Sequence, residues 1–167
     1  MRSALALLAV AALAATASCD LIKHRDVRRI AIRYCDADVL NQWDVRRGLL
    51  SETALKYDDT FPPFPKQPRM RYGPGRLSDF QIEKLFVDWP LATVRVRARF
   101  DIPSDIIAAG ERASVSEDGW YTVKIYLRRE DGLWKVDELA TKKQWISAVV
   151  GPDYGEAWIK EVTGEQP

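Results

Sequence analysis

The sequence predicts an α+β domain in which helices near the N-terminus pack against an antiparallel sheet. Three observations predict it. Apolar side chains recur at helical spacing between residues 26 and 56, a strictly alternating pattern covers Leu91–Phe100, and a second alternating pattern covers 119–139. Helices followed by a run of antiparallel strands are typical of the α+β class.

The segment 119–139, GWYTVKIYLRREDGLWKVDEL, predicts a β-hairpin that turns at Asp131-Gly132. A two-residue type I′ turn needs φ > 0 at both central positions, which glycine supplies and aspartate tolerates. This register places Ile125 opposite Glu138. One face of the hairpin then carries the apolar side chains Tyr121, Val123, Ile125, Leu127, Trp134 and Val136. The other face carries Trp120, Thr122, Lys124, Tyr126, Arg128, Lys135 and Asp137.

The strand predicted over Leu91–Phe100 has the same two-sided character. Its apolar side consists of Val94, Val96, Ala98 and Phe100, and its polar side of Thr93, Arg95, Arg97 and Arg99. Pro90 marks a strand edge or bulge before it, and Pro103 ends it. A slip of one residue would turn the apolar side outward, so the pattern fixes which side faces the core.

The helical spacing predicts helices over 26–35 and 37–47 and a shorter one over 49–56, with a strand at 30–34 as the alternative. Ser78 and Gln81 have capping-box spacing and predict a short helix over 79–85. Residues 140–150 fit either a helix or a strand, and the tail 151–167 fits a last docked helix. The proline-rich segment 58–76 is expected to be an irregular loop, or alternatively a polyproline ligand.

Residues 1–18 have the form of an export signal, with a positive Arg2 before an apolar run from Ala4 to Ala15. That run is too short to span a membrane. Cleavage by ordinary signal peptidase would follow Ala17. Alternatively, the sequence TASC at 16–19 resembles a bacterial lipobox, although this family usually has leucine where Thr16 stands.

We expect lipidation of Cys19, which would make residues 19–26 a lipidated tether and anchor the protein in the membrane of the cell envelope. Asp20 resembles the inner-membrane retention signal of lipoproteins in Gram-negative bacteria, and it favours the inner membrane over the cell exterior. A lipidated Cys19 leaves Cys35 as a buried free thiol. The alternative is a disulfide between the two cysteines.

Charge excludes a nucleic-acid-binding class. The chain has 25 basic side chains, one of which, Arg2, lies in the signal, so the remainder balances 24 basic against 24 acidic groups. A nucleic-acid-binding domain would be strongly basic.

A helical first third, a loop, a strand that opens at Leu91 and the closing hairpin TVKIYLRREDGLWKVDEL together resemble the NTF2-like, cystatin-like superfamily, especially its small bacterial lipoproteins. The resemblance covers about residues 27–140, and we expect the domain to extend over 27–150. It implies a strongly bent antiparallel sheet wrapped around helices, with a pocket between them. The superfamily contains enzymes, binding proteins and assembly subunits, so the fold alone does not give a function.

Candidates for catalysis are few. Enzymes of the superfamily use a His, Asp or Tyr in the pocket, or an Asp-Arg-Asp set, but His24, the single histidine, lies beside the predicted anchor and is expected to be a solvated tether residue. Glu138, expected on the inner face beside Ile125, is a weak candidate for a general base. The paired acids Asp36 and Asp38, and Asp58 and Asp59, fit caps or turns better than a calcium loop. We expect no cofactor and no metal site.

Cations and aromatic side chains alternate on the predicted outer face, an arrangement suited to binding a protein. The residues are Arg95, Arg97, Arg99, Trp120, Lys124, Tyr126 and Arg128. The sequence therefore predicts a membrane-anchored envelope lipoprotein that binds envelope proteins as a non-enzymatic subunit or accessory factor. The alternatives are a small-ligand pocket protein and an enzyme that uses Glu138.

Overall fold

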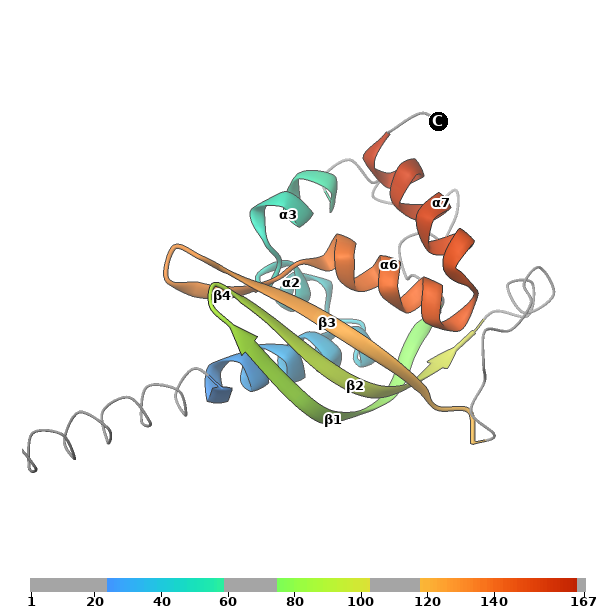
Figure 1. Ribbon diagram of the computed structural model, residues 1–167, viewed down its shortest axis with the longest axis horizontal. Helices are drawn as coiled ribbons and strands as arrows, with labels where there is room; N and C mark the ends of the chain where they lie inside the picture. Colours follow the sequence, from blue (N-terminus) through green and yellow to red (C-terminus); the bar gives the residue numbers. More distant parts are fainter. Residues whose placement is uncertain (1–23, 59–74, 103–117, 165–167) are drawn as a thin grey trace, which may run out of the picture.

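The computed structural model describes residues 24–58, 75–102 and 118–164. Within them it contains five helices and four strands, and the helices pack on a bent antiparallel sheet (Figure 1), so the predicted α+β class is confirmed. The helices are 24–39, α2 (Trp43–Arg47), α3 (Glu52–Asp58), α6 (Glu138–Val149) and α7 (Pro152–Thr163). The strands are β1 (Arg76–Asp88), β2 (Leu91–Asp101), β3 (Tyr121–Glu130) and β4 (Leu133–Val136).

The hairpin of β3 and β4 has the predicted register near its turn, with Leu127 opposite Val136 and Glu130 opposite Leu133. Asp131 and Gly132 have φ of 46° and 78°, as a type I′ turn requires. The ladder ends at Val136, because Asp137 accepts a hydrogen bond from the backbone N–H of Ala140 and begins α6. The predicted pairing of Glu138 with Ile125 is therefore wrong.

Residues 76–88 form a strand, so the helix predicted over 79–85 is wrong. β1 pairs with β2 along its length, but the register shifts between Leu77 and Asp79 and again between Ile82 and Lys84. Each shift is a bulge that inserts one extra residue and increases the bend of a sheet. Pro90, predicted at a strand edge, lies in the turn that joins β1 to β2.

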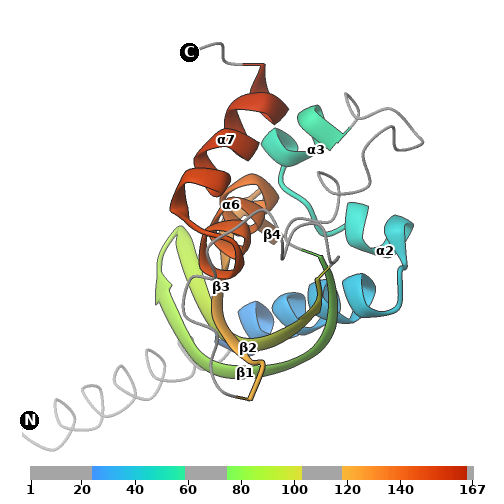
Figure 2. The ribbon, with the colours of Figure 1, turned by 90° about the vertical axis from the view of Figure 1, so that its right-hand side faces the viewer.

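The concave face of the sheet forms the core. Side chains of β2 and β3 alternate as predicted, and Val94, Val96, Val123 and Ile125 are fully buried. The sheet curves around the helix of residues 24–39, which lies inside its concavity (Figure 2). This helix is continuous, so the predicted break near residue 36 and the alternative strand at 30–34 are both wrong.

α6 covers the edge of β3 that β4 leaves unpaired. The hydroxyl of Thr141 accepts a hydrogen bond from the Tyr126 N–H, and Gln144 accepts one from the Lys124 N–H. The indole N–H of Trp145 donates to the Lys124 carbonyl at 2.9 Å. Side chains of a helix thus satisfy backbone groups that an exposed edge strand would present for aggregation. The helical alternative for residues 140–150 is confirmed.

α7 docks on α6, as the helical alternative for the tail predicts. Trp158 and Val162 are buried. A Cβ atom at Gly155 would lie 2.7 Å from the carbonyl oxygen of Lys143, so glycine is what lets the two helices approach this closely. No described helix is long and apolar enough to cross a membrane.

We expect Trp145→Ala to lower the free energy of unfolding by about 3–5 kcal/mol, because Trp145 is fully buried and contacts Tyr34 and Phe100 edge-to-face. Urea unfolding followed by circular dichroism measures the change. The matched control is Trp89→Ala, at a tryptophan that is 54% exposed, for which about 1 kcal/mol is expected. Equal losses at both positions would contradict the assigned core.

Candidate functional site

The outer face of the sheet carries the seven residues predicted to bind a partner. The strand register places Arg95 opposite Lys124 and Arg97 opposite Thr122, on the side away from the core. Arg95, Lys124 and Arg99 are exposed, whereas Arg97, Tyr126 and Arg128 are half-buried. The predicted face therefore exists as a surface, and its binding role remains a prediction.

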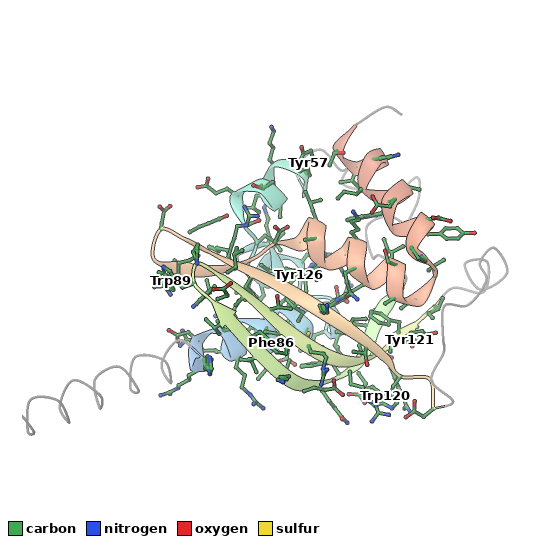
Figure 3. The ribbon with its side chains drawn as sticks, viewed as in Figure 1. Tyr57, Phe86, Trp89, Trp120, Tyr121 and Tyr126 are labelled. Carbon is green, nitrogen blue, oxygen red and sulfur yellow. The ribbon has the colours of Figure 1, made fainter. Side chains whose placement is uncertain are left out.

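Two guanidinium groups lie close to the Trp120 ring on this face. The Cζ atoms of Arg97 and Arg99 lie 5.3 and 4.7 Å from the Trp120 ring, within cation–π range. Arg97 also forms an ion pair with the Asp118 carboxylate, and Arg99 donates to the Asp118 carbonyl oxygen at 3.1 Å. We name Arg97, Arg99, Trp120 and Asp118 the Arg–Trp cluster (Figure 3 labels Trp120).

The remaining arginines of the outer face also have acidic neighbours. Arg95 Nε lies 2.9 Å from Glu83 of β1, and Arg128 lies 2.9 Å from Asp137. These pairs neutralise much of the positive charge that the sequence places on this face. Three of the five cations among the seven residues thus have a carboxylate beside them, and the mixed charge that results is typical of protein surfaces.

A second constellation lies inside the molecule, and sequence reasoning did not find it. Four buried ionisable side chains meet between the first helix, α2 and α6, and we name Asp38, Arg46, Glu138 and Lys142 the ion cluster. Lys142 Nζ lies 3.0 Å from Asp38 Oδ1, and Arg46 Nη1 lies 3.3 Å from the same oxygen. The other Arg46 terminal nitrogen donates to Glu138 Oε1, which also accepts a hydrogen bond from the Tyr34 hydroxyl at 3.1 Å.

The ion cluster balances two cations against two carboxylates. Burial alone would raise the pKa of Asp38, but the charges of Lys142 and Arg46, with hydrogen bonds from Lys142 and from the Leu77 N–H, hold it below its usual value. Burial lowers the pKa of Lys142 to about 8, and the Asp38 carboxylate opposes this shift. Burial likewise raises the pKa of Tyr34. Each buried charge therefore has an opposite charge beside it, which is the condition for keeping ions in a protein interior.

Aromatic rings enclose the cluster. The Arg46 guanidinium lies 4.8 Å from the Trp43 ring and 5.6 Å from the Tyr34 ring, and Lys142 Nζ lies 4.5 Å from the Trp145 ring. These contacts replace part of the hydration that the cations lose on burial. The cluster therefore has the features of a structural clamp between elements far apart in sequence.

The structure changes the setting of the acids that the sequence singled out. Glu138 lies at the start of a helix and pairs with Arg46, so it is not the carboxylate expected beside Ile125 on a strand. Asp38 is buried and ion-paired, which corrects its expected role as a cap or turn residue. Asp36 is exposed, the side chain of Asp58 lies outside what the structure describes, and Asp59 lies outside the described residues.

The histidine and one of the two cysteines lie in the part of the chain that the structure describes. His24 is exposed at the start of the first helix, as expected of a solvated residue. Cys35 is a buried free thiol, as predicted, and burial raises its pKa. Cys19, the export signal and residues 59–74 of the proline-rich segment 58–76 lie outside the described residues. No group of three or more described His, Cys, Asp or Glu residues could hold a metal ion.

We expect the ion cluster to behave as one cooperative unit. Lys142→Met and Asp38→Asn should each lower the free energy of unfolding by about 3–5 kcal/mol, because each leaves a buried charge with less compensation. The double variant should lose about 0.5–3 kcal/mol less unfolding free energy than the sum of the losses of the two single variants. Urea unfolding of all four proteins measures this coupling.

The matched control for that cycle is the exposed pair of Arg29 and Asp26, whose atoms lie 3.1 Å apart. Its coupling, from Arg29→Met and Asp26→Asn, should stay near about 0.5 kcal/mol, as for other exposed pairs. If the coupling energy of Lys142 and Asp38 were no larger than that of Arg29 and Asp26, the ion cluster would not act as a structural clamp.

No family model matches the chain, and no curated protein matches it. Among solved structures, one similar chain is Rv3472, described as a function unknown protein from Mycobacterium tuberculosis. The two chains share 18% sequence identity with a TM-score of 0.37, and the alignment covers 72% of this chain and 70% of that one.

Proposed function

We propose that this protein is a lipid-anchored subunit of the bacterial cell envelope whose NTF2-like domain binds another protein and catalyses no reaction. The anchor is supported by the export signal of residues 1–18 and by the lipobox-like TASC at 16–19. The domain assignment is supported by the bent antiparallel sheet curved around the first helix, the architecture that the NTF2-like resemblance implies.

The observation that carries the proposal is that side chains occupy the concave side of the sheet. Val94, Val96 and Val123 are fully buried there, and Trp145 enters from α6 to contact Phe100. Where the helices meet, the polar groups of the ion cluster already bind one another. Because the described side chains there contact one another, a function exerted at the outer surface is favoured.

The Arg–Trp cluster is the best candidate for the protein-binding surface. Tryptophan and arginine are the side chains most enriched among residues that dominate binding energy. Trp120 contacts both Arg97 and Arg99, so a partner would meet a preformed surface and lose less side-chain entropy on binding. The paired charges around it disfavour a nucleic acid as the partner.

One observation favours the alternative of a small-ligand pocket. Arg46 Nε is buried and has no hydrogen-bond acceptor among the described residues. A small anion that reached it would find a guanidinium flanked by two aromatic rings. Glu138 and Asp38 already neutralise Arg46, however, so an added anion would face two buried carboxylates.

We expect Arg97→Glu to reduce co-purification of envelope partners by about tenfold or more, because it reverses a charge and breaks the contact with Trp120. Affinity purification from detergent-solubilised native membranes, with quantitative mass spectrometry, measures recovery. The control is Arg33→Glu, at an exposed arginine of the first helix, outside the outer face of the sheet. Unchanged recovery with Arg97→Glu would refute this surface.

We expect the mature protein to begin at an acylated Cys19. Intact-mass and N-terminal peptide mass spectrometry of protein from native membranes measures this directly. Cys19→Ser should block acylation and release the protein into the soluble envelope fraction. A mature chain that begins at Ser18 would instead show ordinary cleavage after Ala17.

A further inference from the structure

Large apolar side chains are exposed together at one end of the sheet. Phe86 and Leu91 lie on the two strands that flank the β1–β2 turn, and Trp89 lies in that turn. Leu133 follows the turn of the neighbouring β3–β4 hairpin. Their exposed fractions are 49%, 54%, 54% and 61%, respectively, and we name these four residues the tip patch. Single exposed apolar residues are ordinary, but several in adjacent turns indicate a contact surface.

The two turns of the tip patch are joined to each other. The Trp89 ring lies 5.8 Å from that of Trp134 in an edge-to-face contact. The Arg129 N–H donates to the Pro90 carbonyl at 2.9 Å, and the Arg129 guanidinium lies 5.0 Å from the Trp89 ring. The tip is thus a built surface, held in place by the strands behind it.

The tip patch lies at the same end of the domain as the start of the first helix, and this position points to the partner that covers the patch. The first helix begins at the same end of the molecule as both hairpin turns (Figure 1), the end where Figure 3 labels Trp89. Four residues separate Cys19 from His24, so an extended chain holds the start of this helix within about 18 Å of the predicted lipid anchor. A bilayer that carries the anchor must therefore lie close to this end.

The charges near this end are compatible with a lipid surface. Arg25, Arg28 and Arg29 are exposed in the first two turns of the helix, and Asp26 pairs with one of them. At the sheet tip, cations and carboxylates are mixed, and the Lys84 ammonium lies 4.8 Å from the Phe86 ring. Tryptophan and leucine flanked by long cationic side chains are typical of protein segments in the membrane interface.

We propose that the tip patch inserts into the interfacial region of the phospholipid bilayer that holds the lipid anchor. This inference rests on the anchoring proposed above, and it fixes the orientation of the domain as well as its attachment. Trp89, Leu91 and Leu133 would lie among the headgroups and upper acyl chains. The Arg–Trp cluster, near the other end of the same strands, would face away from the membrane.

The test places a fluorophore on the tip of the lipidated, mature protein in vesicles of phosphatidylcholine and phosphatidylglycerol. Leu133→Cys supplies the labelling site, because Cys35 is buried and Cys19 is acylated. Quenching by nitroxides on the lipid acyl chains should be several-fold stronger for this label than for one at the exposed Ala157→Cys in α7. Adding Trp89→Ser and Leu91→Ser should remove that difference without releasing the protein from the vesicles.

The outcomes separate the two proposals. Vesicle flotation with a label at residue 133 that is quenched no more than the one at 157 would overturn the tip contact and leave the anchor intact. Loss of flotation by the acylation-competent protein would overturn both. Flotation that persists in Cys19→Ser, with lipid quenching at residue 133, would support the tip contact and show that the acyl anchor is not what holds the protein.

Discussion

The carboxylate of Asp38 is the point on which the arrangement of the elements depends. It comes from the last turn of the first helix, lies within 3.0–3.3 Å of Lys142 in α6 and Arg46 in α2, and accepts the Leu77 N–H of β1 at 3.2 Å. Apolar contacts tolerate small shifts, whereas a buried charge without its partners is strongly unfavourable. Only an arrangement that brings all four elements together satisfies this carboxylate. The ion cluster therefore fixes how the helices sit over the concave face.

Much of the sheet could be predicted because its periodicity is strict. β2 alternates throughout, β3 alternates from Tyr121 to Arg128, and Asp131-Gly132 permits the turn that sets the register of β3 with β4. The pattern that predicts a helix over residues 79–85 of β1 has a physical cause. Its two bulges place the inward-facing side chains at positions 77, 80, 82, 85 and 87, so spacings of three and two alternate and obscure the strand period. A capping-box pattern at its start then favoured the wrong element.

The ion cluster left a weaker signal in the sequence. Tyr34 and Asp38 follow Val27 and Ala31 on one stripe of the first helix, and this spacing places Asp38 on the buried side. The position of charged Asp38 on this apolar stripe indicates a buried ion. The spacing of residues along the sequence does not indicate which residues pair with it. Lys142 is 104 residues from Asp38 along the chain, and only the folded topology brings them together. The residues of the outer face were simpler to predict, because strand alternation alone places them there. Alternation does not predict the acidic partners that neutralise them.

On the proposals above, the strands would give the domain two ends with different surroundings. Leu91 and Arg99 belong to the same strand, and eight steps of about 3.3 Å amount to at most about 26 Å between them along this bent strand. That separation is roughly three Debye lengths at physiological ionic strength, so charges of a bilayer at the tip would be largely screened at the Arg–Trp cluster. A partner bound there would be recognised by its own complementarity and not by the lipid composition beneath it. If both proposals hold, the sheet would serve as a spacer that lets one small domain meet a membrane and a protein without competition between the two contacts.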